Sequence, residues 1–275
     1  MEKCSVIISV YNQIKELDLI LTALSIQNFT NFDILIADDG SDSNMKNFIE
    51  EFSSHSLLKI QHIWHSDKGF RKNKILNEAV KNTKTKYLIF IDGDCIPHSE
   101  FVYQHNNNKN SNTVLCGRRV NLGKRISNGI NKQNILNMEF EKVGIKHIYD
   151  SLRRDKTSRS TWVEEGLLIK NRVIRNIYIK GEPRIVGCNF SLNKETIEKI
   201  NGFDENYVGP GFGEDADIEY RLRLAGTKFK TMRNLAILFH LFHPVAKRSD
   251  KNHDYYKEVL KKSDFICKNG LVKIN

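Results

Sequence analysis

The chain of 275 residues lacks the long apolar runs and the paired cysteines that mark membrane-spanning and disulfide-stapled proteins. No window of about 18 apolar residues occurs, so no transmembrane helix is predicted. The residues after Met1 lead directly into a strand-like run. The five cysteines are scattered, with no Cys-x-x-Cys pair and no zinc-type spacing. We therefore expect a cytoplasmic protein with reduced, mostly buried thiols.

Sequence repeats, low-complexity linkers and nucleic-acid-binding motifs are also missing from the chain. It has no zinc knuckle, no aromatic motif of an RNA-binding sheet and no clear helix-turn-helix pattern. The chain is nevertheless basic, with 43 Lys and Arg against 33 Asp and Glu, a net charge of +10. This excess indicates attraction to phosphorylated substrates, an acidic membrane surface or nucleic acid. We expect no nucleic-acid partner, and a basic nucleic-acid-binding protein is the alternative from a different class.

Four strand-like runs begin at regular intervals in the first hundred residues. Their starts lie roughly 25 to 29 residues apart, which fits repeated strand–helix units and a parallel sheet. The runs start at Val6, Asp33, Leu58 and Tyr87. Helices are predicted between them, over residues 15–27, from Asp42 or Ser43 onward, and over residues 73–82. This part of the chain is therefore predicted to form a Rossmann-like half sheet.

The pattern loosens after a further predicted strand at residues 113–117. Polar and basic sequence continues to about Pro183, and basic residues gather in clusters at 68–74, 118–125, 153–159 and 247–251. Recognisable secondary-structure patterns resume after this segment. Strands are predicted at 186–192 and 236–239, helices at 194–200 and 214–225, and a short helix with a strand-like end in the tail. The whole pattern is that of an α/β protein whose least regular part lies in the middle.

An apolar run from Tyr87 to Ile91 ends abruptly in two carboxylates, Asp92 and Asp94, separated by Gly93. The run reads as a buried strand, and open α/β sheets bind ligands at the carboxyl ends of their strands. Asp94 would ligate a hard divalent cation, and Asp92 would share that cation or accept from a ribose hydroxyl. Gly93 would let the chain turn tightly, so that its backbone approaches a phosphate. The pattern predicts a metal site at this strand end.

Polar and aromatic residues also follow the first two predicted strands. The first strand ends at residues 9–12, with Ser9, Tyr11 and Asn12, and the second ends at residues 38–41, with Asp38 and Asp39. A pyrimidine base needs a stacking face and an acceptor for its ring N–H, while a diphosphate needs a cation. The strand ends together therefore predict a nucleoside diphosphate as ligand.

Four of these segments, in this order, resemble the inverting GT-A glycosyltransferases of family two. They are residues 4–12, 37–41, 91–94 and 213–222. The resemblance implies an α/β GT-A fold with a Rossmann-like, mostly parallel central sheet flanked by helices and a smaller acceptor-side region. Residues 1–117 would form the nucleotide-sugar-binding half. Residues 118–275 would form the acceptor-side half of the same catalytic domain, with the catalytic base and a metal-binding histidine.

The resemblance also implies roles for the residues of the nucleotide pocket. Tyr11 would stack on uracil, Asp39 would accept from the base N–H, and Ser9 and Asn12 would line the pocket, while Asp38 braces the turn. Residues 67–71 resemble the segment that closes over the nucleotide. Arg71 is expected to contact the base or a phosphate, unless it is an exposed arginine at a helix start. Asn77 is expected at the nucleotide, with a capping or bracing role as the alternative.

Glu214 and Asp215 would carry the second half of the chemistry. By resemblance, Asp215 is the base that takes the proton of the acceptor hydroxyl, and Glu214 lies near the acceptor hydroxyls. The alternative is an ordinary acidic first turn of a helix. His240, at a predicted strand end, is the first choice for completing the metal shell beside Asp94, and His243 is the second. Oxygen ligands with an imidazole suit Mn²⁺ or Mg²⁺.

The expected reaction is transfer of a hexose or N-acetylhexosamine from a UDP-sugar to a glycan or lipid-linked saccharide in bacterial surface polysaccharide synthesis. Residues 211–215 resemble the stretch before the catalytic acid in galactosyl- and N-acetylgalactosaminyltransferases, including chondroitin-type polymerases, but Phe212 stands where that family usually has tryptophan. A sugar-nucleotide nucleotidyltransferase is the other enzymatic alternative, although the glycine- and lysine-rich loop it needs is missing. The pairs Arg153-Arg154 and Lys247-Arg248 offer a hypothetical attachment to the anionic inner face of the cell membrane. Trp162 would stack on a sugar or belong to the core.

Overall fold

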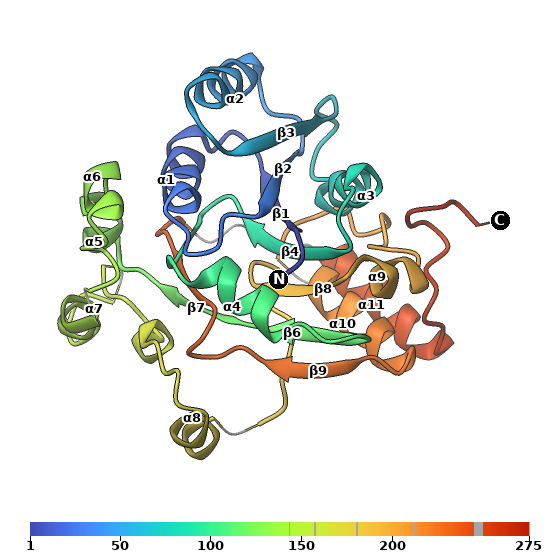
Figure 1. Cartoon of the computed structure of the whole chain (residues 1–275). Helices are drawn as coiled ribbons and strands as arrows, with labels where there is room; N and C mark the ends of the chain where they lie inside the picture. Colours follow the sequence, from blue (N-terminus) through green and yellow to red (C-terminus); the bar gives the residue numbers. More distant parts are fainter. Residues whose placement is uncertain (143, 157, 180, 212, 245–249, 275) are drawn as a thin grey trace.

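The computed structural model describes residues 1–142, 144–156, 158–179, 181–211, 213–244 and 250–274. A seven-stranded sheet forms its centre, in the order β3-β2-β1-β4-β8-β6-β9 (Figure 1). Its strands are β1 (Cys4–Val10), β2 (Phe32–Asp38), β3 (Lys59–Trp64), β4 (Tyr87–Asp92), β6 (Thr113–Cys116), β8 (Phe190–Asn193) and β9 (Lys228–Thr231). The four strands β3, β2, β1 and β4 are parallel, and β6 is parallel to β9, while β8 runs antiparallel to both of its neighbours. The expected mostly parallel sheet is confirmed.

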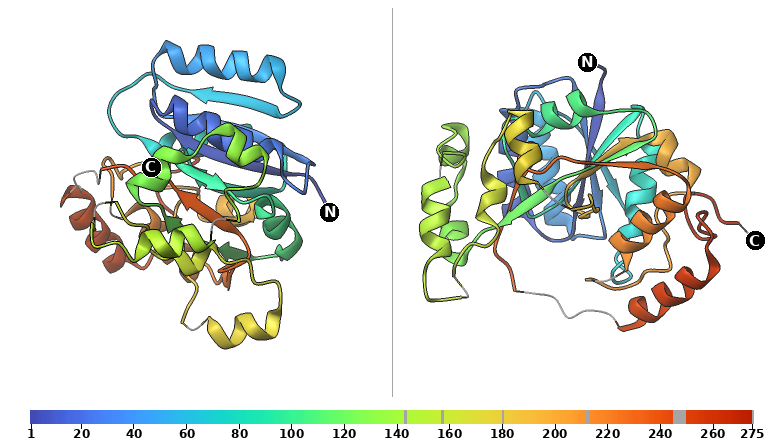
Figure 2. Two further views of the ribbon diagram at one scale, coloured as in Figure 1. Left: turned by 90° about the vertical axis from the view of Figure 1, so that its left-hand side faces the viewer. Right: turned by 90° about the horizontal axis from the view of Figure 1, so that it is seen from below.

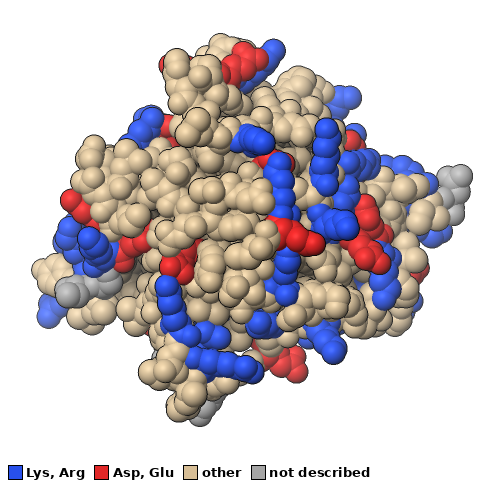
Figure 3. Space-filling view, viewed as in Figure 1, with Lys and Arg blue, Asp and Glu red and all other residues tan. Residues whose placement is uncertain are grey.

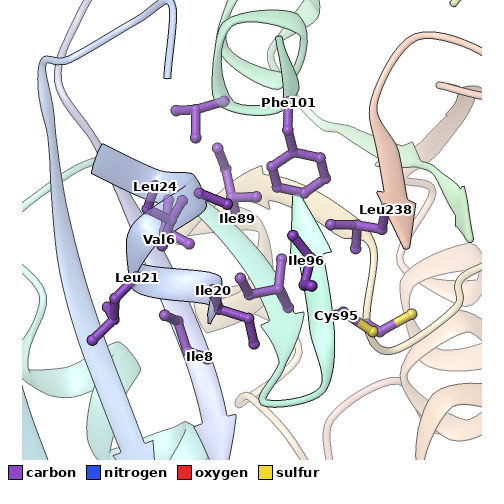
Figure 4. Close-up of a cluster of buried hydrophobic side chains, with 14 of the residues drawn as sticks. Val6, Ile8, Ile20, Leu21, Leu24, Ile89, Cys95, Ile96, Phe101 and Leu238 are labelled. Atoms are coloured by element: carbon purple, nitrogen blue, oxygen red, sulfur yellow. The ribbon is translucent and has the colours of Figure 1, made fainter. Parts of the chain in front are cut away.

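Helices cover both faces of the sheet because the buried strands alternate their side chains between two apolar cores. Val6 and Ile8 of β1 pack with helix α1 (Ile14–Ser25) in one core, whereas Ile7 packs with helix α3 (Lys72–Asn82) in the other. Figure 4 shows the first core, where Leu21 and Leu24 of α1 lie against the strands. Helix α2 (Ser43–His55) is capped by the Asp42 carboxylate, as expected. This strand–helix alternation leaves the carboxyl ends of β1 and β4 at one edge of the sheet.

A second, three-stranded sheet continues from that edge in the order β5-β10-β7. Its strands are β5 (Cys95–Pro97), β7 (Arg118–Asn121) and β10 (Ile237–His240). Strand β10 pairs antiparallel with β5, with His240 opposite Cys95, and parallel with β7. The register therefore brings the end of β10 beside the Asp92–Asp94 turn.

The irregular middle of the chain folds into short helices at one side of the molecule (Figures 1 and 2). They are α5 (Lys124–Gly129), α6 (Lys132–Leu136), α7 (Gly144–Ser151), the 3₁₀ helix η1 (Val163–Gly166) and α8 (Arg172–Tyr178). The other helices are α4 (Phe101–Asn108), α9 (Lys194–Lys199), α10 (Glu214–Leu224) and α11 (Asp250–Lys262). Within the described ranges, every helix is too short or too polar to cross a bilayer. Strands β8 and β9 rejoin the sheet begun by residues 1–117, so both expected halves share one sheet.

The expected strand at residues 186–192 is wrong in its first part. Residues 186–189 form a turn, closed by the Asn189 N–H donating to the Val186 carbonyl at 2.7 Å, and β8 starts only at Phe190. The turn is held in place from several sides, since the Asn189 amide donates to the carbonyls of Arg118 and Ala236. The turn brings the backbone of Gly187 to the start of α10, where the acidic pair Glu214 and Asp215 lies.

Candidate active site

A cavity of about 1150 Å³ opens at the carboxyl ends of β1 and β4. Its walls come from segments that are far apart in the sequence. They include the end of β1, Asp39 after β2, the Asp92–Asp94 turn, the start of α10, residues 240–243, and Arg119, Asn121 and Leu122 around the end of β7. Such a volume suits a ligand of nucleotide size or larger. The expected strand ends therefore meet around a single cavity.

Asp94, His240 and His243 form a compact group on one wall of this cavity. The Asp94 Oδ2 lies 3.4 Å from His240 Nε2 and 3.3 Å from His243 Nε2, and the two Nε2 atoms are 3.1 Å apart. Burial disfavours the Asp94 carboxylate, but hydrogen bonds from the two histidines outweigh it and lower its pKa. The thiol of Cys95 donates to the other carboxylate oxygen at 3.1 Å. The group is held in place from β10 on one side and from the β4–β5 turn on the other.

The donor set of this group fits a divalent metal ion. Neighbouring ligands of an octahedral ion with bonds of about 2.1 Å lie about 3 Å apart, close to the three separations between these atoms. One carboxylate and two imidazoles suit Mn²⁺ as well as other first-row ions. Asp92 does not belong to this group of three among the described residues. The structure therefore brings both predicted histidines to Asp94 and leaves Asp92 beside them.

Asp92 is held instead by Ser9 and Lys72. The Ser9 hydroxyl donates to Asp92 Oδ1 at 2.9 Å, and the Lys72 ammonium lies 2.8 Å from the same oxygen. The ammonium also lies 3.9 Å from Glu214 Oε1. Burial works against the Lys72 charge, but the carboxylates of Asp92, Glu214 and Asp215 outweigh it and hold its pKa well above the usual value. Lys72 is thus the cation that joins the acidic turn after β4 to the acidic start of α10.

Glu214 and Asp215 occupy the first turn of α10, directly after Gly213. This glycine has φ = 98°, a backbone conformation that favours glycine, and it lets the chain enter the helix beside the cavity. The N–H of Gly187 donates to Asp215 Oδ2 at 2.9 Å, whereas Glu214 Oε2 is buried without a partner in the structure. Burial raises the pKa of Glu214 to about 7, with Lys72 opposing the shift, and burial also raises the pKa of Asp215. Both groups are therefore poised to bind protons more tightly than ordinary carboxylates.

The predicted base pocket lies at the other end of the cavity. Tyr11 is 48% exposed, and its hydroxyl donates to Asp67 at 3.0 Å, which leaves a ring face open to the solvent. The Asp39 carboxylate accepts from His65 at 2.7 Å and from the backbone N–H of Arg71 at 2.8 Å. Burial raises the pKa of Asp39, although these partners oppose the shift. The pocket is thus shaped by residues of the segment that was expected to close over a nucleotide.

Two supporting residues hold the turns of this pocket. Asn12 has φ = 53° and joins the ends of β1 and β2, because its N–H donates to Ser41 Oγ and its side-chain oxygen accepts from the Asp42 N–H. Asp38 accepts from the Ser41 N–H at 2.8 Å and contacts His62 at 2.9 Å, so it braces the turn as expected.

Two expected nucleotide contacts are placed differently. Asn77 is fully buried on α3, where its amide donates to the Phe203 carbonyl and to Glu205 and accepts from the Phe203 N–H. All its polar atoms are used in joining α3 to the loop after α9, so the nucleotide contact expected for Asn77 is wrong and the bracing alternative holds. The guanidinium of Arg71 donates to the Ser66 carbonyl, and its side chain does not line the cavity. Arg71 shapes the pocket through its backbone.

Gly93 is required by close packing. A Cβ atom at Gly93 would lie 2.8 Å from the Ser9 carbonyl oxygen and 2.9 Å from side-chain atoms of Val10 and Gln13. Its N–H donates to that same carbonyl at 2.7 Å. The missing side chain therefore lets the Asp92–Asp94 turn lie directly against the end of β1.

Four cations of the cavity were not predicted individually. Lys72, Arg119, Lys156 and Arg159 line it, and they come from three of the four basic clusters of the sequence. The clusters were the available signal, but only the fold shows which of their members face the cavity. These cations make the cavity suited to an anionic ligand. Trp162 is 58% exposed, so it is not a core residue, and Phe212, Lys247 and Arg248 lie outside the described residues.

Comparison with known proteins identifies the family. The chain belongs to glycosyl transferase family 2, whose profile matches residues 5–199. A second profile, described as the N-terminal domain of galactosyltransferase, matches residues 175–244. The chain is similar to the chondroitin synthase of Escherichia coli, with 26% identity over 246 residues that cover 86% of this chain and 34% of that protein. It spans 34%, 65% and 26% of the length of three curated relatives.

Solved structures show that the fold is that of the GT-A glycosyltransferases. The structure of S. aureus TarS matches with a TM-score of 0.57 at 18% identity, over 95% of this chain and 65% of that chain. GalNAc-T7, solved with UDP, GalNAc and Mn²⁺, matches with a TM-score of 0.63 at 14% identity, over 95% of this chain and 48% of that chain. The family and fold expected from the four motifs are confirmed.

Proposed function

We propose that this protein is a metal-dependent, inverting glycosyltransferase that moves a hexose or N-acetylhexosamine from a UDP-sugar to a saccharide hydroxyl. The observation that carries the proposal is the arrangement around one cavity of a group that could hold a metal ion (Asp94, His240 and His243) and the acidic pair Glu214 and Asp215, with Lys72 between Asp92 and Glu214. The metal-holding group serves the departing nucleoside diphosphate, which needs a cation. The acidic pair serves the attacking hydroxyl, which needs a base in a defined position. The family to which the chain belongs supports the same reaction class.

A UDP-sugar is the proposed donor. TarS has been solved with UDP-GlcNAc and GalNAc-T7 with UDP and GalNAc, which supports uridine as the nucleoside. Tyr11 offers an exposed ring for stacking on uracil, and Asp39 lies at the same end of the cavity as an acceptor for the base N–H. Ser9 and Asp92 are proposed to face the ribose. The galactosyltransferase profile favours galactose or N-acetylgalactosamine as the sugar.

The residues of the cavity supply the remaining chemistry. A Mn²⁺ or Mg²⁺ ion held by Asp94, His240 and His243 would neutralise the charge that grows on the departing diphosphate. Asp215, oriented by the Gly187 N–H, accepts the proton of the attacking hydroxyl. Glu214, whose pKa of about 7 is raised by burial, binds and orients that acceptor. Direct displacement opposite the leaving group gives a β-linkage from an α-linked donor.

The acceptor is proposed to be a glycan or lipid-linked saccharide of a bacterial surface polysaccharide. The chondroitin synthase of Escherichia coli supports a polysaccharide context. Arg153 and Arg154 are exposed, which suits the predicted attachment to an anionic membrane surface from the cytoplasmic side.

A donor screen tests this function. The protein is incubated with a panel of sugar nucleotides, a saccharide acceptor and Mn²⁺, and nucleoside diphosphate release is measured. We expect turnover with a UDP-sugar, loss of turnover in EDTA, and loss in Asp94→Asn and Asp215→Asn, with Asp264→Asn, a tail carboxylate outside the cavity, as the matched control. Full activity in Asp215→Asn together with loss in Glu214→Gln would transfer the role of base to Glu214. Preference for a donor other than a uridine one would refute the proposed base pocket.

A further inference from the structure

Helix α8 carries its apolar side chains on the outside. Val173, Ile174 and Ile177 are 68%, 55% and 71% exposed. At helical spacing they share one side of the helix. Arg175 points the other way, is partly buried and donates from its guanidinium to the Ile169 carbonyl at 3.2 Å. A surface helix ordinarily buries its apolar side. The opposite arrangement of α8 marks this side as an interaction surface.

The surroundings of this apolar side are basic. The sequence has no Asp or Glu from Leu167 to Gly181, while Lys170, Arg172 and Arg175 fall within this stretch. Lys230 of β9 lies close by, since burial and then the charges of Arg175 and Arg172 lower its pKa. In Figure 3, Lys and Arg side chains are spread over the visible face, and several lie in the lower part, where Figure 1 places α8. Figure 2 shows α8 projecting from the rest of the fold. Lys170 is paired with Glu100 at 2.8 Å, so the positive charge beside the projecting apolar side comes from Arg172, Arg175 and Lys230.

We propose that α8 is a docking element for an anionic phospholipid bilayer. Its three aliphatic side chains enter the boundary between headgroups and acyl chains, and Arg172 contacts headgroup phosphates. Charge complementarity favours this partner over a second copy of this chain, because the helix has no acidic residue to pair with the basic groups of a chain whose net charge is +10. The two turns of α8 are too short to span the membrane, so the helix lies on its surface.

Docking by α8 is separate from the transfer reaction. None of its residues lines the cavity, so membrane binding and sugar transfer succeed or fail independently. If the acceptor is lipid-linked, as proposed above, docking by α8 would hold the enzyme at the membrane surface that carries this acceptor.

Vesicle co-sedimentation of the full chain tests the proposal. We use vesicles of phosphatidylcholine alone and of phosphatidylcholine mixed with phosphatidylglycerol, and we expect binding to the anionic vesicles that weakens with salt. Combined Val173→Ser, Ile174→Ser and Ile177→Ser should weaken this binding at least about a hundredfold, since three aliphatic side chains lose their buried environment. Arg172→Gln should weaken it roughly fivefold. The matched control is Leu57→Ser, which alters a fully exposed leucine in the loop between α2 and β3.

A second measurement does not rely on loss of binding. All five native cysteines are buried, so a cysteine introduced by Ile177→Cys can be labelled selectively with an environment-sensitive dye. We expect a blue shift of its emission with anionic vesicles and none for a dye at Leu57→Cys. Equal binding of the triple variant and the native chain, failure of the native chain to bind anionic vesicles, or an unshifted dye would overturn the proposal. So would native dimers in sedimentation that the triple variant disperses, because α8 would then contact a second copy.

Discussion

Replacing Glu214 with glutamine tests the electrostatics of the acidic pair directly. Glu214 is mostly buried, with a side chain 14% exposed, and one of its carboxylate oxygens has no partner in the structure. Burial, reinforced by Asp215 and Asp92, raises its pKa to about 7, while Lys72 limits the shift. The substitution keeps the shape of the side chain and removes its titration. The difference in free energy of unfolding between the variant and the native protein should therefore depend strongly on pH.

The size of this dependence follows from the raised pKa of Glu214. An unfolded glutamate titrates near pH 4.3, so between that pH and about 7 the folded protein holds the proton more tightly than the unfolded chain. The folded state is therefore increasingly destabilised as pH rises through this window, and the penalty is complete above about pH 7. At about 1.4 kcal/mol for each pKa unit, the full penalty is about 4 kcal/mol. Glu214→Gln should gain this amount relative to the native protein between about pH 4.5 and pH 8.

The assay is thermal or urea denaturation in EDTA, at several pH values across this window. A gain of about 4 kcal/mol should raise the unfolding midpoint of the variant, relative to the native protein, by roughly 8 °C more at the high-pH end than at the low-pH end. Glu51→Gln, an exposed position on α2, is the control and should show no such trend. A stability difference for Glu214→Gln that stays constant with pH would refute the reasoning, because the carboxylate would then ionise at no cost in the folded state.

Further predictions concern the groups around the cavity and the core beside it. Lys72→Met should lose about 3 kcal/mol of unfolding free energy, mostly above pH 7 where Glu214 is charged, and shift the pH profile of turnover upward; a profile identical to the native one would contradict this role. Gly93→Ala should cost about 1–3 kcal/mol in chemical denaturation, because its Cβ would collide with the main chain of β1, and unchanged stability would contradict the close packing. Asp217→Asn leaves the buried Arg221 without its 2.6 Å ion pair and should cost about 3–5 kcal/mol of unfolding free energy. The double variant Asp217→Asn, Arg221→Met should regain part of this loss. Asp94→Asn should weaken Mn²⁺ binding in calorimetry at least about tenfold, and equal affinity would exclude the carboxylate as a ligand.

The strand ends of the site could be predicted from the sequence because each follows a long apolar run. The runs that became β1, β2 and β4 are buried on both faces, so they read as nearly continuous apolar runs and the polar residues after them stand out. His240 was predicted on the same basis, at the end of β10. Strands β5, β7 and β9 were not predicted, because these short segments contain no comparable apolar run.

Side-chain roles that depend on distant partners could not be predicted. Asn77 stands beside the apolar stripe of α3 and reads as a polar residue of a helix, yet its partners are the backbone of Phe203 and the side chain of Glu205. Lys72 is one of several lysines in its segment, and only the approach of α10 to β4 distinguishes it. Sequence spacing describes local geometry, whereas these roles depend on which loops the fold brings together.

The ladder between β10 and β5 has a consequence for the order in which this site forms. Asp94 belongs to the first half of the chain and the two histidines to its last part, and they meet only when β10 has paired in the register that sets His240 opposite Cys95. Until then Asp94 is a single carboxylate with little affinity for a metal ion. A slip of one residue in this pairing would turn His240 to the other face of the strand. The appearance of tight metal binding during refolding would thus time the arrival of the last strand, and it would separate correctly registered molecules from those with a complete but shifted sheet.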